Sequence, residues 1–475
     1  MAVEGGQMAR NQPVSPMGQY FSSSVLSVNI LAIFESEIPM DDSKAMWALE
    51  NLFLPINPRF SSIMVKNEHG ILTWRKVKVK LEEHVNIPLF PPGLEFYDDS
   101  MQEYLSKVGT ELLPHDRPLW DIHIIKYPTR NAPGTMAFKL HHSLGDGFSL
   151  MGALFSCLRR ADDPSLPLTF PSSSESSRHF AKWIRIDKSI YRLFNTCFNT
   201  FRDFGWSFLM SNCMEDDRTP MRSGDAGIEF RPITLSTITF SLNDIKQIKA
   251  KLKATVNDVI TGIIFYGIQL YMQAASQGKT KTSRVTALVT LNTRAIKSYQ
   301  SIQEMTKPNS KSQWGNHFAF LHVSIPRYKD VENADPLEFV LKAKRIIRSK
   351  RNSLAIYLTG GLLELLRKLK GPEAAARYIY ATAQKTTLVI SNMIGPMEQV
   401  QIAGHPVQSL YFMMVHVPQS LTVTITSYAG KVKVAVGMEK GFINSEVFVS
   451  CMEKSFQRMF KAAAGKQTST SEFNA

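Results

Sequence analysis

Residues 135–147 have the sequence TMAFKLHHSLGDG, and this stretch decides the interpretation of the fold. Met136, Phe138 and Leu140 alternate with smaller or polar residues, a period of two that predicts a half-buried strand over 135–140. Behind the glycines, apolar residues recur at helical spacing, at Met151, Leu154, Phe155 and Leu158. HHSLGDG therefore lies in a loop between a strand and a helix, where a rigid scaffold commonly presents reactive groups.

The motif His141-His142-Ser143-Leu144-Gly145-Asp146-Gly147 contains groups that suit acyl transfer by a general base. An acyl group moves from a thioester to a hydroxyl when a base takes the hydroxyl proton. An imidazole with a pKa near 6.5 suits that task and is typically worth ~10²–10⁴ in rate. The thiolate of coenzyme A, with a pKa of about 8.5, leaves readily and is reprotonated by the same imidazolium. One histidine therefore suffices, without a covalent intermediate.

The remaining motif residues allow several roles. Asp146 either orients an imidazole, as in a catalytic triad, or turns away and pins the loop through an arginine. Gly147 would permit a tight turn into the helix. Competing interpretations are a metal ion held by the two histidines and the aspartate, histidines satisfied within the core, and a nucleophilic Cys157. No further metal-ligand cluster lies nearby, and the helical repeat around Cys157 favours a buried, inert thiol.

Length and charge bound the class of protein. A chain of 475 residues is too long for one ordinary core, so we expect two domains. Its net charge of +14 favours an anionic cosubstrate such as coenzyme A or a membrane surface, with a merely basic soluble surface as the plain alternative. No zinc-finger spacing, RNP-like motif or long basic run supports nucleic acid as a partner.

Targeting and redox signals are few. The four cysteines are scattered without a CxxC pair, which indicates neither a zinc cage nor a disulfide framework and favours a reducing compartment. Residues 1–16 are polar and lack the apolar core of a signal peptide. No run of 18 apolar residues occurs, so we expect no conventional membrane span.

Composition divides the chain into three segments. Residues 1–163 hold the histidine motif and a β-hairpin, whose strands at 122–127 and 135–140 are joined by PTRNAPG. Residues 164–228 begin with a Pro- and Ser-rich linker and continue into an amphipathic helix. Residues 229–475 form a second mixed block. Strands and helices intermingle in both blocks, so the predicted class is α/β.

The amphipathic helix is the strongest periodic signal in the chain. Its large side chains step by three or four residues, at Ile190, Phe194, Cys197, Phe201, Phe204 and Phe208. The polar residues between them are Arg192, Asn195, Asn199, Arg202 and Asp203. Such a helix lies in a membrane interface, covers an apolar tunnel, or packs on the protein's own core. Arg202 and Asp203 would make a single span costly.

The second block predicts strands over 233–240, 285–291, 421–428 and 431–438, the last two joined as a hairpin. Helices are expected over 241–253, behind Thr255-Val256-Asn257-Asp258, and from about residue 444. Thr255 with an acid three residues later has the form of a helix N-cap. The apolar helix behind it is expected to be a buried core helix.

Several short motifs narrow the interpretation further. HHSLGDG resembles the active-site motif of coenzyme-A-dependent acyltransferases with the chloramphenicol-acetyltransferase-like fold. The flanking landmarks resemble the wax ester synthase/diacylglycerol acyltransferase family, and the short polar N-terminus and the amphipathic insert resemble its plant members. These landmarks are Pro13-Val14-Ser15-Pro16-Met17, Arg117-Pro118-Leu119-Trp120, Thr255-Val256-Asn257-Asp258-Val259, Trp314-Gly315-Asn316 and Ser391-Asn392-Met393-Ile394-Gly395-Pro396. Trp120 is followed by Asp121 where the family pattern suggests Glu.

The resemblance implies a two-lobed fold, with mixed sheets, flanking helices and a central channel that holds the histidines. It makes His142 the base, His141 a support for its orientation, and Asp146 a structural anchor. Arg294, in Leu291-Asn292-Thr293-Arg294, is our candidate partner for Asp146 from the other lobe. Asn257 and Asp258 match a family motif of less certain role, for which helix capping is the plain interpretation. No metal and no cofactor is expected, with acyl-CoA as the cosubstrate.

The sequence thus predicts transfer of a long-chain acyl group from acyl-CoA to a long-chain alcohol, with diacylglycerol as a second acceptor. Transfer to small soluble alcohols or amines is one alternative, although the related Asp-Phe-Gly-Trp-Gly signature is approached only by Asp203-Phe204-Gly205-Trp206-Ser207 in mid-chain. A non-catalytic lipid-binding scaffold is another. The resemblance places the protein at the cytosolic face of the endoplasmic reticulum membrane, peripheral or monotopic, or at the plasma membrane.

Overall fold

The computed structural model of this chain describes residues 12–68, 70–171, 186–276, 283–294, 305, 314–328, 330–351 and 353–465, without the side chains of 186–195 and 351. The helices are α1 (Pro16–Phe21), α2 (Asp42–Ala48), α3 (Asp98–Thr110), α4 (Gly147–Ser156), α5 (Ile186–Asn212), α6 (Leu242–Leu252), α7 (Val256–Ala275), α9 (Pro336–Arg351), α10 (Ala355–Lys370), α11 (Pro372–Gln384) and α12 (Ser445–Gly465). Short 3₁₀ or π turns lie at Leu49–Phe53, Leu54–Ile56, Pro58–Ser61, Leu81–Glu83 and Ile228–Phe230.

The strands are β1 (Asn29–Ser36), β2 (Ser62–Lys66), β3 (Leu72–Lys76), β4 (Val85–Asn86), β5 (Trp120–Ile125), β6 (Gly134–His141), β7 (Leu158–Arg160), β8 (Ile233–Ser241), β9 (Thr286–Asn292), β10 (Phe318–Ser324), β11 (Leu388–Ile394), β12 (Val400–Ile402), β13 (His405–Val415), β14 (Leu421–Tyr428) and β15 (Lys431–Glu439). The expected mixed α/β class is confirmed.

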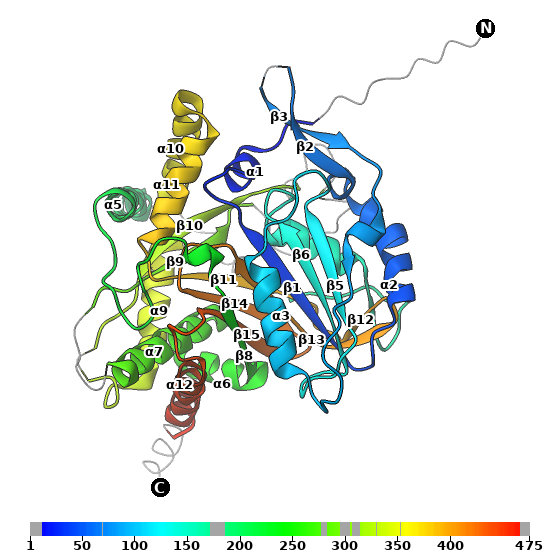
Figure 1. The fold of residues 1–475 in the computed structure, drawn as a ribbon. Coiled ribbons are helices and arrows are strands. Elements are labelled where there is room, and N and C mark those ends of the chain that lie inside the picture. Colours follow the sequence, from blue (N-terminus) through cyan, green and yellow to red (C-terminus); the bar gives the residue numbers. More distant parts are fainter. Residues whose placement is uncertain are drawn as a thin grey trace.

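Two sheets define two lobes, which lie side by side in Figure 1. The first sheet has the order β4-β5-β6-β1-β13-β12-β7, and the second β10-β9-β11-β14-β15-β8. Strands β2 and β3 form a separate two-stranded sheet. The predicted hairpin is confirmed, because β5 pairs antiparallel with β6 from Trp120 opposite Leu140 to Ile125 opposite Thr135.

The lobes exchange chain. Strands β12 and β13 come late in the sequence but lie in the first sheet, where β13 pairs antiparallel with β1. The chain then returns to the second sheet through β14. Residues 229–475 therefore do not all lie in one lobe, and no single cut separates the lobes. Strand β1 therefore lies between β6 and β13, and its first residue, Asn29, stands opposite His141 on one side and Val415 on the other.

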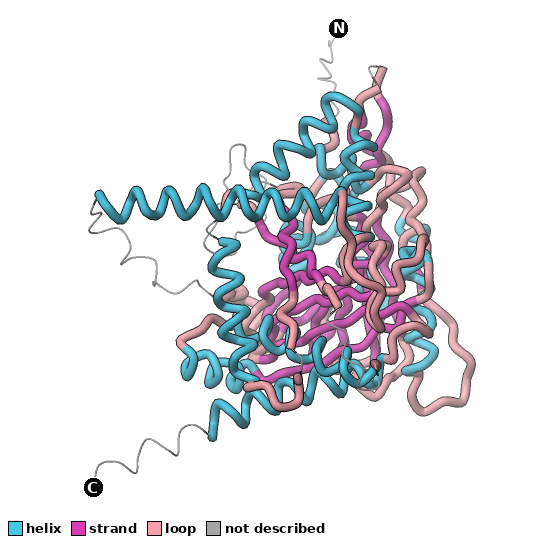
Figure 2. Tube along the Cα trace, turned by 90° about the vertical axis from the view of Figure 1, so that its left-hand side faces the viewer, coloured by secondary structure: helices cyan, strands magenta, loops and turns pink. Residues whose placement is uncertain are grey.

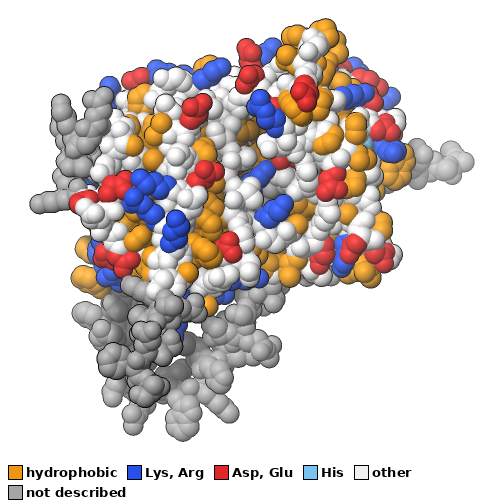
Figure 3. All heavy atoms as spheres, turned by 90° about the horizontal axis from the view of Figure 1, so that it is seen from below, with side chains coloured by type: hydrophobic (Ala, Val, Ile, Leu, Met, Phe, Trp, Pro, Cys, Tyr) orange, Lys and Arg blue, Asp and Glu red, His pale blue; other side chains and the backbone are white. Residues whose placement is uncertain are grey.

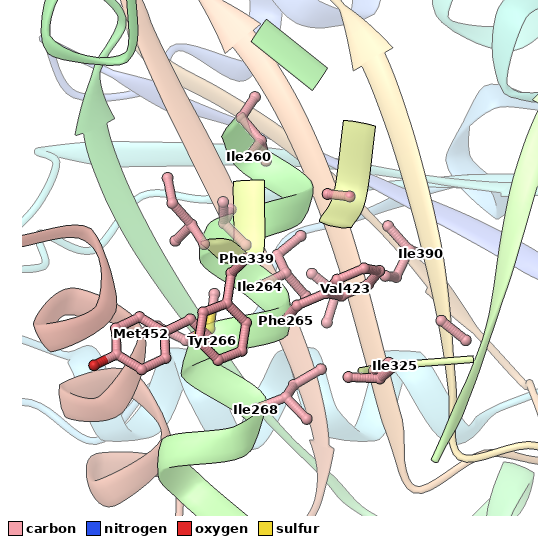
Figure 4. Close-up of a cluster of buried hydrophobic side chains, with 14 of the residues drawn as sticks. Ile260, Ile264, Phe265, Tyr266, Ile268, Ile325, Phe339, Ile390, Val423 and Met452 are labelled. Carbon is pink, nitrogen blue, oxygen red and sulfur yellow. The ribbon is translucent and has the colours of Figure 1, made fainter. Parts of the chain in front are cut away.

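Helix α7 supplies much of the hydrophobic core of the second lobe, and Figure 4 shows its buried side chains in close-up. Ile264 and Ile268 of α7 are fully buried toward the sheet, and Phe339 of α9 stacks on Tyr266 at 4.6 Å between ring centroids. The N-terminus of α7 carries the capping box expected at Thr255 and Asp258. The burial of Ile264 and Ile268 confirms the predicted buried core helix. Each fully buried side chain of this size stabilises the fold by about 1.5–3 kcal/mol.

Several other expected elements are also present. The strands predicted at 233–240, 285–291, 421–428 and 431–438 correspond to β8, β9, β14 and β15. The helix expected over 241–253 is α6, capped by Ser241, and the closing helix is α12. One boundary was wrong. The helix after the histidine motif ends at Ser156, and Leu158 begins β7, because its backbone pairs with Ile402 of β12.

The amphipathic signal does form one long helix, α5, which extends past the sheets as the longest helix of Figure 2. Its orientation differs from a simple apolar-inside arrangement. Phe201 is 82% exposed, whereas Asp203 is buried and forms an ion pair with Lys350 of α9 at 3.0 Å. The stretch that approaches the Asp-Phe-Gly-Trp-Gly signature, residues 203–207, lies within α5 and so belongs to a helix. No helix within the described ranges combines the length and apolarity needed to cross a bilayer.

The linker prediction concerns residues 164–178, of which 172–178 lie outside the described residues. The described part is held against the protein. Thr169 N donates to a Glu398 carboxylate oxygen at 3.0 Å, and the rings of Phe170 and Phe155 lie 5.5 Å apart. After α5, in the last part of the predicted segment 164–228, Asp216 accepts hydrogen bonds from Thr286 and Thr387 of the second lobe.

Charge on the face seen from below is mixed. Figure 3 shows Lys and Arg interspersed with Asp and Glu across it, with hydrophobic side chains between them. The Lys and Arg side chains therefore do not form one basic patch on this face.

Candidate active site

His142 lies between the two lobes, directly after β6. Its backbone N donates to Val28 O at 2.9 Å, which extends the strand pairing and fixes where the side chain points. Its ring sits between the rings of Phe21 and Phe318, at centroid distances of 4.7 and 5.0 Å. Phe318 belongs to β10 of the second lobe, so both lobes hold this imidazole.

Asn316 sets the tautomer of His142. Its Nδ2 donates to His142 O at 2.9 Å, which leaves Oδ1 facing His142 Nδ1 at 2.9 Å. Since an amide oxygen only accepts, Nδ1 carries the proton and Nε2 keeps a lone pair. Burial lowers the pKa of His142 below its ordinary value, while Asp146 and the hydrogen bond to Asn316 act in the opposite direction. The ring is therefore neutral at pH 7, the state that a general base requires.

His141 points to the other side of the strand. Its Nδ1 accepts from the backbone N of Ser143 at 3.1 Å, and its Nε2 lies 3.1 Å from Ser27 Oγ. Both nitrogens are thus occupied, and burial lowers the pKa of His141 to about 3. This geometry suits a group that holds the motif loop in place, as expected for His141, and not one that contacts a reacting atom.

Asp146 and Arg294 meet across the lobes, as the sequence analysis anticipated. Arg294 Nη1 lies 2.6 Å from Asp146 Oδ2, and Nη2 lies 3.1 Å from Oδ1. This two-point contact is buried on both sides, with side-chain exposures of 2% and 5%. Asp146 Oδ1 also accepts from Ser149 N at 2.9 Å and so caps α4. The contacts of Asp146 are those of an anchor between lobes.

The segment 314–317 of the second lobe holds the motif loop along its length. Trp314 Nε1 donates to Leu144 O at 2.8 Å, and His317 N donates to Asp146 Oδ2 at 2.8 Å. Gly315 O accepts from Ser149 Oγ and Arg294 Nη2 at 3.1 and 2.8 Å. The sequence analysis used Trp314-Gly315-Asn316 as a landmark but gave it no task. Its contacts span about 170 residues, so no local spacing could reveal them.

The other predicted site residues have more peripheral places. Gly147 starts α4 without a positive φ, so the turn does not need a glycine there, contrary to expectation. A Cβ at Gly147 would instead lie 3.3 Å from Met393 Sδ. Asp258 caps α7, whereas Asn257 Oδ1 accepts from Asn392 Nδ2 at 2.8 Å.

Two cavities meet at His142, and together they form a channel between the lobes. The wide arm, of about 420 Å³, passes Met151 and Phe155 of α4 and Asn392 of β11. The narrow arm, of about 70 Å³, is mainly apolar and runs along β10 toward α5. His142 and Phe318 line both arms. The imidazole therefore stands where the two cavities adjoin.

The competing interpretations of the motif fit this geometry less well. Cys157 is buried, and burial raises the pKa of its thiol to about 12, which suits an inert side chain. His142 is not a core histidine with both nitrogens satisfied, because it lines the channel. Within the described ranges, no three His, Cys, Asp or Glu side chains are grouped so as to bind a metal ion.

Comparison with known proteins agrees with the fold and the motif. Residues 25–260 match the wax ester synthase/diacylglycerol acyltransferase catalytic domain, and residues 314–460 match the WS/DGAT C-terminal domain. Wax ester synthase/diacylglycerol acyltransferase 11 from Arabidopsis thaliana is 30% identical over 90% of this chain and 90% of its own length. Wax ester synthase/diacylglycerol acyltransferase 4 from the same plant is 28% identical over 98% of this chain and 93% of its own.

Solved structures share the two-lobed architecture. Wax ester synthase/diacylglycerol acyltransferase from Marinobacter aquaeolei VT8 aligns with a TM-score of 0.59 at 17% identity, over 95% of this chain and all of that chain. The starter condensation domain of rhizomide synthetase aligns with a TM-score of 0.53 at 10% identity, over 92% of this chain and 89% of that chain. Fold, motif and sequence together show that this chain belongs to the wax ester synthase/diacylglycerol acyltransferase family.

Proposed function

We propose that this protein transfers a long-chain acyl group from acyl-CoA to a long-chain alcohol, and also to diacylglycerol. The observation that carries this proposal is the placement of His142 at the junction of two cavities, with Nδ1 held by Asn316 so that Nε2 keeps its lone pair. Membership of the family supplies the class of acceptor, and the apolar lining of the narrow arm suits a chain that avoids water.

In the proposed reaction, His142 Nε2 takes the proton of the acceptor hydroxyl while its oxygen attacks the thioester carbonyl. The resulting tetrahedral intermediate collapses with cleavage of the carbon–sulfur bond. The thiolate of coenzyme A leaves and takes the proton from the imidazolium, which regenerates the neutral base. Polar side chains on the wide arm, such as Thr290, Ser391 and Asn392, are candidate donors to the oxyanion. Acyl-CoA is consumed as a cosubstrate, and we propose that no bound cofactor takes part.

The test is release of free thiol from palmitoyl-CoA by the purified protein, with hexadecanol or a diacylglycerol as acceptor. His142→Ala should lower the rate ~10²–10⁴-fold, because the proton acceptor is lost. His405→Ala is the matched control: His405 is as buried as His142 but binds Asp41 N at 2.8 Å, outside the channel. A His142→Ala protein that turns over at the wild-type rate would remove His142 as the base.

We further propose that the protein works on the cytosolic face of the endoplasmic reticulum membrane, or at the plasma membrane. The support is the lipid class of the proposed acceptors and the positive net charge of +14, which anionic leaflets attract. A fluorescent fusion should colocalise with a marker of one of these membranes and sediment with microsomes. A fusion spread evenly through the soluble fraction would contradict this location.

A further inference from the structure

The outer face of α10 exposes a stripe of large apolar side chains. Leu354, which precedes the helix, is 52% exposed, Tyr357 61%, Leu365 52% and Leu369 73%. Their spacing of three, eight and four residues places them on one side of a helix, opposite Leu363, which is 9% exposed. This helix thus shows its apolar side to the outside.

Helix α5 continues the same surface. It contacts α10 and α11, and all three lie at the same side of the second lobe in Figure 1. Leu354 N donates to Thr200 Oγ1 at 2.9 Å, which brings the stripe of α10 next to the exposed Phe198 and Phe201 of α5. A patch of this extent on two neighbouring helices marks a surface for a partner or a membrane.

Charge around the patch identifies an anionic partner. Helix α9, the short connection and α10, residues 336–370, carry nine Lys and Arg against two Glu. This segment supplies half of the net charge of the whole chain. Arg345 and Arg348 on α9 are exposed, as are Lys368 and Lys370 at the end of α10. Apolar side chains bordered by Lys and Arg are the composition of a surface that lies on an anionic bilayer.

The narrow arm of the channel ends beneath this surface. Phe318, Phe320 and His322 line the arm from one face of β10, and the strand rises about 13 Å from Phe318, beside His142, to His322. At that end, His322 Nδ1 lies 3.0 Å from Ser207 Oγ of α5. His322 also lines a shallow groove with Phe201 and Leu209 of α5.

We infer that α5 and α10 dock this protein on an anionic lipid bilayer, and that the lipid acceptor enters the narrow arm from that bilayer beneath α5. This inference rests on the proposed function for the identity of the acceptor. It assigns to α10 a task that its sequence did not suggest, and it explains why Phe198, Phe201 and Phe208 of α5 are exposed. The two substrates then approach His142 from different media, the acceptor from lipid and acyl-CoA through the wide arm from water.

The experiment compares two triple variants of the full chain. The patch variant combines Phe198→Ser, Tyr357→Ser and Leu369→Ser, whose wild-type side chains are 60%, 61% and 73% exposed. The control variant combines Trp47→Ser, Leu89→Ser and Leu112→Ser, which are 60%, 89% and 53% exposed in the first lobe. Each protein is mixed with vesicles of phosphatidylcholine alone, or with phosphatidylserine at about a third of the lipid, and the bound fraction is measured by flotation.

Wild type and control should bind the anionic vesicles at least tenfold better than the neutral ones, with binding that falls as salt rises, since salt screens the charge. The patch variant should lose at least tenfold in binding. Its ratio of activity on hexadecanol in vesicles to activity on a short soluble alcohol should fall by a similar factor. Equal vesicle binding by patch and control variants would overturn the inference.

A second copy of the chain is the other occupant that the patch would suit. In that case the wild type would elute as a dimer, the patch variant as a monomer, and vesicle binding would not change, which also overturns the inference. Failure of the proposed function looks different. The wild type would then bind vesicles but release no thiol with any acceptor.

Discussion

At the scale of single residues, the proposed chemistry depends on the environment of one imidazole. His142 has a base-ready Nε2 because Asn316 occupies Nδ1, and because burial disfavours the imidazolium. His141 carries the same side chain one position earlier, yet its two nitrogens are engaged by Ser143 and Ser27. Adjacent histidines thus have different hydrogen-bond partners because successive side chains of an extended chain point to opposite sides.

Asn316 is a positioning residue whose charge can be changed with little change in shape. We expect Asn316→Asp to place a carboxylate against Nδ1–H and to move the acid limb of the pH profile of kcat/KM upward by about 1 to 3 pH units. Asn316→Ala should lower kcat about tenfold or more with little effect on KM, because the tautomer is no longer fixed. A pH profile of Asn316→Asp that matches the wild type would show that Asn316 only fills space.

At the scale of elements, close contact between helices holds the second lobe together. Gly262 lies in the middle of α7, where a Cβ would come within 2.8 Å of Val340 Cα and 2.9 Å of Val340 N in α9. Gly267, one and a half turns later, faces Met452 of α12. The two glycines let α7 pack closely against both neighbouring helices, α9 and α12.

Glycine-to-alanine substitutions in two helices should have opposite effects on stability. Gly262→Ala should lower the free energy of unfolding by about 1–3 kcal/mol, because the clash is with backbone that cannot move aside. Gly360→Ala in α10 meets nothing within 4 Å and should raise stability by about 0.5–1 kcal/mol through helix propensity. Urea unfolding of both variants checks this. Equal changes in the free energy of unfolding of the two variants would show that the α7–α9 contact accommodates a methyl group at Gly262.

At the scale of the whole molecule, both lobes bury histidines in the neutral state. Burial lowers the pKa of His123 and His416 to about 4, of His322 to about 4 and of His141 to about 3. The unfolded chain binds these protons near pH 6.5, whereas the folded chain does not. Because these folded-state pKa values are depressed, their stabilisation is full above pH 6.5 and is lost as the pH falls toward 4.

We therefore expect the free energy of unfolding to fall between pH 6.5 and 5 with a slope of about 1.4 kcal/mol per pH unit for each such histidine. Urea unfolding at several pH values in this window measures the slope, above the range where most carboxylates titrate. In His322→Gln this slope should be smaller by about 1.4 kcal/mol per pH unit, the contribution of one histidine. A stability that stays constant from pH 7 to 5 would contradict neutral burial of these residues.

The sequence by itself determined the features that depend on neighbours along the chain. The hairpin before the histidine motif, the cap formed by Thr255 and Asp258, and the amphipathic α5 all follow from periodicity and local hydrogen bonding, so they were predicted correctly. The partner of Asp146 was also anticipated, but from the family resemblance and not from spacing. The end of α4 was misplaced, since a distant strand recruits Leu158.

Only the tertiary structure decided the rest. It brought Asn316 to His142 across 174 positions, inserted β13 beside β1, and turned Phe201 of α5 toward the outside. The physical reason is the same in each case. Hydrogen-bond partners and buried surface are set by which elements pack together, and packing over such separations leaves no period in the sequence. The motif thus suggested the reaction, while the packing of the lobes decided that His142 lines the channel and that His141 is held by Ser143 and Ser27.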